Sequence, residues 1–410
     1  MAVRLWIVWL CSALTFAALA ASAVADSSAP SPAPAGVNDR PACTAAPADG
    51  VRCDALVVTD AAGRALATPS PSGFGPQQFH GAYDLPLVAV SPKTIAIVDA
   101  FDSTTIESDL GVYDAAFALP PCTTANGCFR KVNQLGRPGP YPRIDNGWAP
   151  EIALDVETAH ATCQNCRILL VEADSAHFRD IAAAEDTAAA LGADVISNSF
   201  GGARPGVRAK AAFEHPGIAI VASTGDAGFG VQFPADSPFV VAVGGTSLQV
   251  TSNAPGVYGY GGETAWSGAG SGCSAQFAAQ PWQLHDPSWP LTGCGAQRAM
   301  ADVAADADPA TGAAVYNSCC GFVGWLKVGG TSVAAPLIAG VFGLAAGDAA
   351  FPGSLPYGNR TGLHDVTSGS NGGCGTIMCE AAVGYDGPTG LGSPDGLASF
   401  TATGGGNALR

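Results

Sequence analysis

The chain has 410 residues, 48% of them hydrophobic and only 13% charged, a composition that allows a large buried core. Its formal net charge is −16 and its pI is about 4.5, which disfavours nucleic acid and anionic membranes as partners. The same balance suits a protein that works in acid, because protonation of carboxylates reduces their mutual repulsion.

Residues 1–25 have the pattern of a secretory signal peptide. Arg4 supplies the basic start, residues 5–21 form the apolar core, and residues 23–25 fit a small-residue cleavage site that leaves Asp26 as the new N-terminus. An uncleaved membrane anchor is the alternative. No other segment is long and apolar enough to span a bilayer.

Twelve of the 13 cysteines follow this signal, and an even number in an exported chain favours disulfides. The close pairs are Cys43/Cys53, Cys122/Cys128, Cys163/Cys166, Cys273/Cys294, Cys319/Cys320 and Cys374/Cys379. The Cys163-x-x-Cys166 motif could also bind zinc or be redox-active, but nothing completes a zinc site, so we expect a local disulfide. A bridge between the adjacent Cys319 and Cys320 is strained, so pairing of these two with other cysteines is an open alternative.

A Pro/Ser/Ala-rich linker (26–40) and a polar stretch without periodicity (41–80) precede alternating strand and helix patterns. Strands are predicted at 94–99, 167–172, 194–199, 217–222 and 238–243, and helices at 151–162, 178–191, 207–214 and 333–346. This alternation predicts an α/β fold with a parallel sheet and helices on both faces. Asp99, Ser199 and Asp226 follow apolar strands, so they should line one rim of the sheet.

Gly330-Thr331-Ser332 opens an apolar run that is typical of a buried helix. A serine there lies at the positive end of the helix dipole among free backbone N–H groups, which suits a nucleophile that faces a developing oxyanion. An ordinary N-cap on a buried helix would show the same pattern.

Glu151 and Asp155 are four residues apart in a predicted helix, so their carboxyl groups share one face. A serine nucleophile needs a general base and a group that orients it. A solvated acidic face is the alternative, which the apolar residues interleaved between the two carboxylates weaken. None of the six histidines stands in the His-Gly-Thr context of a subtilisin-type base. Asp226 lies in a Gly-rich turn that permits close approach to a substrate, although aspartate is also common in ordinary turns.

The ordered set of motifs resembles the sedolisins, serine-carboxyl peptidases built on a subtilisin-like core. Their Glu-x-x-x-Asp helix is similar to residues 151–155, and their Ser-Gly-Asp turn to residues 224–226. Their Ser-Gly-Thr-Ser-x-x-x-Pro motif resembles residues 329–336, with Gly329 in place of the first serine. The resemblance runs from about Tyr83 to the end of the chain.

This resemblance implies that Ser332 is the nucleophile, Glu151 its general base, and Asp155 the residue that orients Glu151. Asp226 then donates a hydrogen bond to the oxyanion beside the Ser332 N–H, which requires a protonated carboxyl group. Glu151 and Asp155 should share protons as a coupled pair, so activity is expected in acid and not near neutrality.

Two further positions are marked by the resemblance. Asp99 lies where some members carry a carboxylate that extends the chain behind the base. Residues 199–202 resemble the strand that lines the primary specificity pocket.

The C-terminal segment resembles the calcium site of the family. The resemblance implies one Ca²⁺ ion, with ligands from Asp365, Val366, Ala382, Gly384 and Asp386, of which the two aspartates bind through carboxylates and the others through carbonyls. Oxygen ligands on a Gly-rich loop fit this cation. Two unrelated turns are the alternative.

The expected organisation is a signal peptide (1–25), a short N-terminal pro or linker segment (26–82) and a sedolisin-like peptidase domain (83–410). The domain is expected to combine the subtilisin-like parallel sheet with a C-terminal calcium-binding loop region. Residues 26–82 are too few for the usual large prodomain of the family, so the sequence does not say how activity is restrained.

The sequence therefore predicts a secreted, extracellular serine-carboxyl endopeptidase that acts on protein or peptide substrates in acid. We expect a monomer that binds neither nucleic acid nor, after signal removal, a membrane. One alternative is a catalytically weak peptidase-like fold that serves as a binding protein. Another is a neutral Ser-His-Asp protease, for which His160 is the nearest candidate base but lies off the face shared by Glu151 and Asp155.

Overall fold

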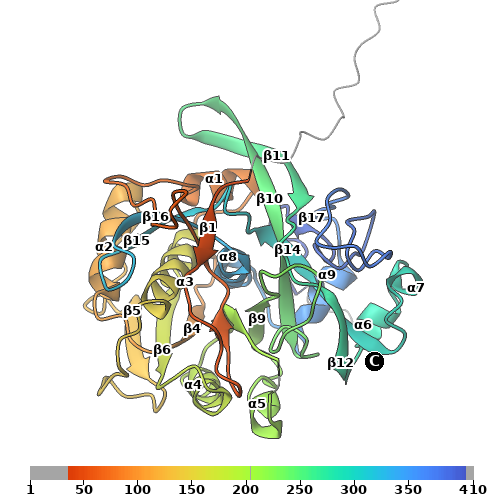
Figure 1. The fold of residues 1–410 in the computed structure, drawn as a ribbon, viewed down its shortest axis with the longest axis horizontal. Coiled ribbons are helices and arrows are strands. Elements are labelled where there is room, and N and C mark those ends of the chain that lie inside the picture. The colour runs from red at the N-terminus through yellow and green to blue at the C-terminus, as the bar shows by residue number, and fades with distance from the viewer. Residues whose placement is uncertain (1–35, 204, 403–410) are drawn as a thin grey trace, which may run out of the picture. The chain divides into compact units, whose positions relative to one another are not determined.

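A computed structural model describes residues 36–203 and 205–402 (Figure 1). The predicted signal peptide, most of the predicted linker and Cys11 therefore lie outside the described residues. Of the helices that the structure describes, none is both long and apolar enough to cross a membrane.

A twisted central sheet forms the core. Its strands, in spatial order, are β11 (Val257–Ala265), β10 (Val240–Ala254), β9 (Ala219–Ser223), β7 (Val195–Asn198), β4 (Thr94–Ala100), β6 (Arg167–Ala173) and β5 (Phe129–Asn133), and β14 (Val303–Asp306) also pairs with β10. These strands pair in parallel, except that β10 and β11 form an antiparallel hairpin. The interior strands are mostly apolar and almost entirely buried because helices cover both faces.

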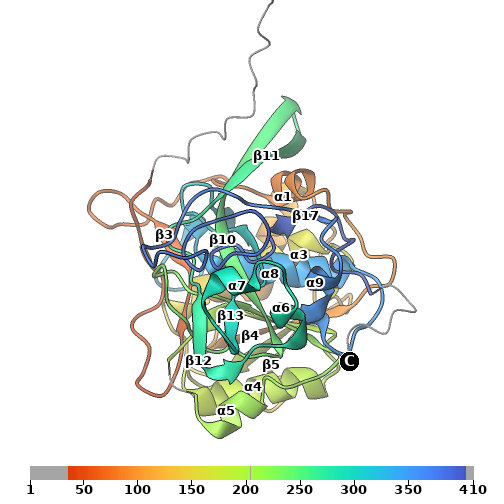
Figure 2. The same ribbon diagram turned by 90° about the vertical axis from the view of Figure 1, so that its right-hand side faces the viewer.

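Helices lie on both sides of this sheet, as Figures 1 and 2 show. The helices on one side are α3 (Trp148–Thr162) and α8 (Thr331–Leu344), with α2 (Ile106–Phe117) packed beside α3. The helices on the other side are α4 (Phe178–Ala190) and α5 (Val207–Ala211).

Helices α3 and α8 are buried along their whole length and pack directly on each other. Gly340 of α8 permits this close approach, since a Cβ atom there would lie 2.4 Å from Cβ of Thr162 in α3. This contact lies in the C-terminal halves of both helices and fixes the distance between them.

A smaller sheet includes the first described residues. Its order is β1 (Asp39–Pro41), β3 (Leu56–Val58), β16 (Gly324–Gly329) and β15 (Ala313–Asn317). Between β1 and β3, β2 (Arg52–Cys53) pairs antiparallel with β8 (Phe200–Gly201). The helix α1 (Pro76–Ala82) follows. The stretch 41–80, for which the sequence predicts no regular structure, thus contributes strands that depend on distant partners.

The C-terminal part carries short elements joined by loops (Figure 2). Its elements are β12 (Gly272–Ala278), β13 (Gln297–Met300), β17 (Leu363–His364), β18 (Ser393–Pro394), α6 (Pro281–Leu284), α7 (Trp289–Thr292), α9 (Leu355–Gly358) and a 3-10 turn at Pro352–Ser354. A separate apolar cluster that includes Trp289, Met378 and Tyr385 stabilises this part.

The predicted strands and helices of the core are confirmed with small shifts at their ends. The clearest difference is β10, which runs to residue 254 instead of 243 because it continues outward into the hairpin with β11. In addition, α5 is shorter than predicted and ends at Ala211.

All twelve described cysteines form disulfides with their sequence neighbours. The pairs are Cys43–Cys53, Cys122–Cys128, Cys163–Cys166, Cys273–Cys294, Cys319–Cys320 and Cys374–Cys379. The expected local disulfide at Cys163 is confirmed. Cys319 and Cys320 bond to each other, so the alternative that they pair elsewhere is not realised; every other described cysteine has its own partner.

Candidate active site

Ser332 lies in the first turn of α8 and is fully buried. The helix is preceded by Gly330, whose φ of 98° is a left-handed conformation that favours glycine. The Ser332 hydroxyl donates a hydrogen bond to the Ser199 carbonyl oxygen at 3.2 Å. Its backbone N–H points to the carbonyl oxygen of Asp54 at 3.3 Å.

Glu151 and Asp155 lie one turn apart on α3, as predicted, and both are completely buried. The Ser199 hydroxyl donates to Oδ1 of Asp155 at 2.7 Å, whereas neither carboxyl oxygen of Glu151 has a hydrogen-bond partner among the described residues. Burial, together with repulsion from Asp155 and Asp99, raises the pKa of Glu151 well above its usual value. The Ser332 hydroxyl is close enough to oppose this rise, although its hydrogen bond goes to Ser199.

Asp99 is a third buried carboxyl group, next to Glu151 and Asp155. It is the last but one residue of β4, opposite Glu172 of β6, and its oxygens have no hydrogen-bond partner among the described residues. Burial raises its pKa well above the usual range, and the charges of Asp155 and Glu172 raise it further. The pKa of Asp155 is raised by burial in the same way. Groups that are this close and this poorly solvated hold protons jointly in acid.

Asp226 follows β9 and faces the start of α8. Its Oδ1 accepts hydrogen bonds from the N–H of Thr331 at 2.8 Å and from the Thr331 hydroxyl at 3.0 Å. Its Oδ2 is buried without a partner among the described residues. Burial and the nearby Asp54 raise the pKa of Asp226 well above its usual value, so this oxygen carries a proton in acid. The structure thus brings together Ser332, Glu151, Asp155 and Asp226.

His160 does not belong to this group. Its ring is buried at the other side of α3, where Nε2 lies 3.0 Å from the Pro120 carbonyl oxygen and 3.3 Å from Asp114. The geometry therefore gives no support to a neutral mechanism that uses His160 as the base.

A feature that the sequence did not reveal is the position of residues 50–58, which pair with β8 and β16 and bring the Asp54 carbonyl oxygen to the Ser332 N–H. They carry no recognisable motif, and their placement depends on pairing with strands about 150 and 270 residues further along the chain. A helical or strand periodicity could not have indicated it, because each paired stretch is only two or three residues long.

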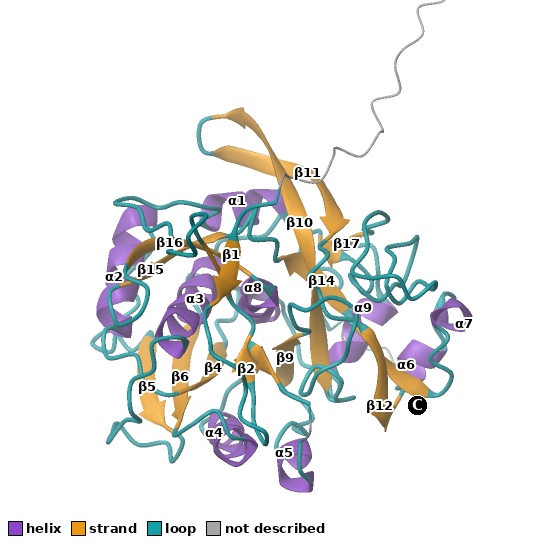
Figure 3. Cartoon of the chain, viewed as in Figure 1, coloured by secondary structure: helices purple, strands orange, loops and turns teal. Residues whose placement is uncertain are grey.

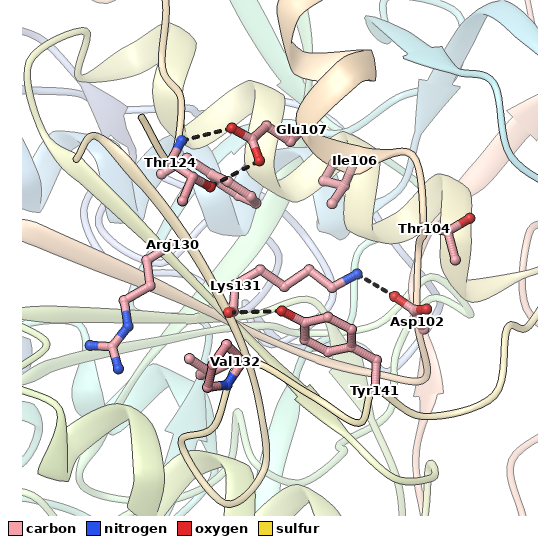
Figure 4. A pocket seen from close by; sticks show the side chains of 11 residues that line it. Asp102, Thr104, Ile106, Glu107, Thr124, Arg130, Lys131, Val132 and Tyr141 are labelled. Carbon is pink, nitrogen blue, oxygen red and sulfur yellow. Dashed lines mark hydrogen bonds and ion pairs between the residues drawn. The ribbon is translucent and has the colours of Figure 1, made fainter. Parts of the chain in front are cut away.

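A cavity of about 430 Å³ lies beside β5, away from Ser332 (Figure 4). In its wall, Lys131 contacts Asp102, lies 3.0 Å from Glu172 and stacks on the ring of Tyr141. Burial nevertheless raises the pKa of Glu172 to about 8, although the Lys131 ammonium opposes this rise. The buried carboxyl groups thus follow one another as Glu151, Asp155, Asp99 and Glu172, and Lys131 pairs with the last of them.

The predicted calcium ligands lie together in the C-terminal loops. Oδ2 of Asp365 accepts from the N–H of Gly384 at 2.9 Å, and Oδ2 of buried Asp386 accepts from the N–H of Ala382 at 3.0 Å. Burial raises the pKa of Asp386 to about 7, and the charge of Asp365 adds to this rise. The two carboxylates therefore lie on neighbouring turns, and oxygen atoms of this kind are the ligands that Ca²⁺ prefers.

Comparison with known proteins agrees with this geometry. The model of the subtilase family matches residues 152–358, about half of the chain. The chain belongs to the subtilase family. Sedolisin of Pseudomonas sp. strain 101 is 34% identical over 181 residues, which cover 41% of this chain and 29% of that protein. Kumamolisin of Bacillus sp. strain MN-32 is 33% identical over 206 residues, which cover 44% of this chain and 35% of that protein. The chain thus spans about a third of the length of these curated relatives.

The solved structure of Pseudomonas sedolisin, described as a serine-carboxyl proteinase complexed with pseudo-iodotyrostatin, superposes with a TM-score of 0.65. The match has 25% sequence identity and covers 80% of this chain and 96% of that one. A psychrophilic protease superposes with a TM-score of 0.50 at 18% identity, which supports the fold alone. The chain is therefore a sedolisin-like member of the family with a subtilisin-like core, a parallel sheet between helices.

We predict that Gly330→Ala destabilises the protein more than Gly63→Ala. Both glycines have a left-handed φ, so both substitutions carry backbone strain of about 1–2 kcal/mol. At Gly63 the new Cβ meets nothing within 4 Å, whereas at Gly330 it would lie 2.0 Å from the Asp54 carbonyl oxygen and 2.6 Å from Oδ2 of Asp226. Chemical denaturation of the two variants measures the difference. Equal losses would contradict this description of the site.

We predict that the free energy of unfolding falls as the pH rises above about 5. The buried carboxyl groups have raised pKa values, so between their unfolded pKa values near 4 and their folded values the native state binds more protons than the unfolded state. Each such group contributes a slope of about −1.4 kcal/mol per pH unit. Burial lowers the pKa of His364, so this residue makes the free energy of unfolding rise with pH. It is a single group, and the several carboxyl groups outweigh it.

Denaturation at constant saturating calcium between pH 4 and 8 measures this slope. Glu185→Gln, in α4 and outside the site, removes one buried carboxyl group of raised pKa and should make the slope less steep. A stability that increases from pH 5 to 7 would show that the carboxyl groups are ionised in the native protein.

Proposed function

We propose that the chain is a secreted serine-carboxyl endopeptidase that hydrolyses peptide bonds in acid through an acyl-enzyme. The observation that carries this proposal is the convergence of Ser332, Glu151, Asp155 and Asp226 from three separate elements on one buried point. The relatives named above support it, as does the set of six disulfides, which is typical of an exported protein.

In the proposed mechanism, Ser332 Oγ attacks the carbonyl carbon of the substrate and Glu151 accepts its proton. Asp155, held by the Ser199 hydroxyl, orients Glu151 and shares its proton. The oxyanion receives hydrogen bonds from the Ser332 N–H and from protonated Oδ2 of Asp226. Glu151 then returns the proton to the leaving nitrogen, and water hydrolyses the ester.

This chemistry requires different protonation states on neighbouring carboxyl groups. Glu151 must accept a proton while Asp226 keeps one, which is possible only while the cluster as a whole is partly protonated. Because burial raises the pKa of all these groups, the proposed activity belongs to the acidic range and ends as Asp226 loses its proton.

We also propose that one Ca²⁺ ion binds through Asp365, Asp386 and the carbonyls of Val366, Ala382 and Gly384. The ion would neutralise the two carboxylates and join the two loops, and it takes no part in the chemical step. The boundaries at residues 25 and 82, export from the cell and the monomeric state remain predictions from the sequence.

The role of Asp226 provides the test of the proposed function. Asp226→Ala removes the second oxyanion donor and should lower turnover of a peptide library by about 10²–10³ at acidic pH. Asp226→Asn keeps an acceptor for Thr331 and places an amide donor at the Oδ2 position, so it should retain more activity and lose it at a higher pH. Ser332→Ala provides the inactive control. Turnover by Asp226→Ala within a few-fold of wild type would overturn the proposed mechanism.

The calcium proposal predicts that Asp365→Ala lowers the free energy of unfolding and that a chelator lowers it equally in the wild type. The expected loss is about 3–4 kcal/mol when free calcium is about 100–1,000 times the dissociation constant. Asp395→Ala, which removes an exposed carboxylate from a neighbouring loop, serves as the control. Thermal unfolding that responds neither to chelator nor to added calcium would exclude the site.

A further inference from the structure

Thr331 connects Asp226 to the first turn of α8. Strand β9 packs against α8, and the loop that follows β9 carries Gly225 and Asp226 to the start of that helix (Figure 3). Thr331 is fully buried there. Its N–H and its hydroxyl both donate to Oδ1 of Asp226, at 2.8 and 3.0 Å. One residue thus places two hydrogen-bond donors on the same carboxyl oxygen.

The direction of the hydroxyl bond is set by Gly225. The N–H of Gly225 donates to Oγ1 of Thr331 at 3.1 Å, and a backbone N–H can only donate. The oxygen of the hydroxyl is thereby an acceptor, and its single hydrogen is directed at Asp226. The reverse direction would place a proton on Oδ1 of Asp226, where it would face the hydrogen of the Thr331 N–H. The hydrogen bonds therefore run from Gly225 through Thr331 to Asp226.

The backbone fixes both ends of this chain of hydrogen bonds. The Gly225 carbonyl accepts from the N–H of Gly270 at 2.9 Å, which holds the turn before Asp226. Gly225 has a φ of 105° and Gly330 a φ of 98°, left-handed conformations that favour glycine. Thr331 and Asp226 therefore meet in one orientation.

The second oxygen of Asp226, Oδ2, is in a different situation. It is buried without a hydrogen-bond partner among the described residues, and it lies 2.6 Å from the position that a Cβ atom of Gly330 would take. A proton on Oδ1 would compete with the two donors of Thr331, whereas a proton on Oδ2 leaves both hydrogen bonds in place. The geometry therefore favours the proton on the oxygen that donates to the oxyanion in the proposed mechanism.

The titratable and charged groups that act on Asp226 are Asp54 and Arg52. Burial and the charge of Asp54 raise the pKa of Asp226 well above its usual value. The hydrogen bonds from Thr331 and the charge of Arg52 lower it, because a donor stabilises the ionised carboxylate more than the neutral acid. Removal of the Thr331 hydroxyl should therefore keep Asp226 protonated to a higher pH, with the position of its proton less well defined.

We propose that Thr331 is a positioning residue for the reaction, whose two donors to Oδ1 hold the proton of Asp226 on Oδ2 and direct it at the oxyanion. This inference rests on the proposed function. The proton stays on Oδ2 while the oxyanion forms and collapses, so Thr331 orients a donor and transfers no proton itself.

The test compares the pH profiles of peptide-library turnover by the full-length wild type and by Thr331→Val, which removes the hydroxyl and nearly preserves the volume. Loss of one donor to Oδ1 should lower turnover at the acidic optimum by about 3- to 10-fold. It should also shift the alkaline limb of the profile upward by about 0.5–1 pH unit, because Asp226 then keeps its proton longer. A residue that only supports packing would lower the rate without moving the limb.

Further variants assign the shift to Asp226. Thr331→Ser keeps the hydroxyl and should return both the rate and the limb to near the wild-type values. In the Asp226→Asn background, Thr331→Val should leave the limb where Asp226→Asn alone places it, because position 226 no longer titrates. Thr331→Ala also lacks the hydroxyl and should show the same shift if Thr331→Val does not fold.

A matched control is available in α2. Thr105→Val removes a threonine hydrogen bond of 2.6 Å to the buried carboxyl group of Asp109, outside the proposed site. It should change neither the turnover nor the alkaline limb.

The outcomes separate the two proposals. If the wild type hydrolyses the library and the limb of Thr331→Val stays in place, the inference is overturned and the proposed function stands. A shift that persists in the Asp226→Asn background would also overturn the inference, because Thr331 would then act on another group. A wild type that hydrolyses no peptide, or a Ser332→Ala variant that is as active as the wild type, would overturn the proposed function together with the inference.

Discussion

The close contact between α3 and α8 is the constraint on which the site depends. Because Gly340 has no side chain, the two helices approach until Thr162 fills the space, which fixes their spacing in the half remote from the site. Glu151 lies in the first turn of α3 and Ser332 in the first turn of α8, at the other ends of these two helices. Both helices are buried along their whole length, so the carboxyl groups near Ser332 are shielded from solvent.

The lack of water determines the electrostatics of the site. Four carboxyl groups, Asp99, Glu151, Asp155 and Asp226, lie in a region where ionisation is costly. Lys131 forms its ion pairs with Asp102 and Glu172 and with none of these four groups. A histidine would become cationic as it accepted a proton, whereas a carboxylate becomes neutral. In the proposed mechanism a carboxylate base therefore suits a buried acidic cluster, and it restricts the pH range of the proposed activity.

The sequence predicted the core well because its signals are local. Apolar strand runs such as 94–99 and the spacing of Glu151 and Asp155 depend on neighbours within one or two turns. The resemblance to sedolisins added the roles of Asp226 and Ser332. Residues 50–58 were missed because their structure depends on Phe200 and Gly329, and no short-range pattern specifies such pairings. Likewise, the strain of a bridge between adjacent residues argued against a Cys319–Cys320 disulfide. The two cysteines nevertheless pair, because each of the other described cysteines is already bonded to a different partner.

The disulfide between Cys43 and Cys53 has a consequence for the fate of the first described residues. Both of its sulfurs belong to the part before Ala55, and the other five disulfides lie wholly after it. The described residues up to Cys53 are therefore joined to the residues after them by the backbone and by non-covalent pairing such as that of β2 with β8. A foreign protease that cut the backbone between Cys53 and Cys122 would leave two pieces without a covalent link between their described parts, and their separation would follow mass action, favoured by dilution and opposed by high concentration.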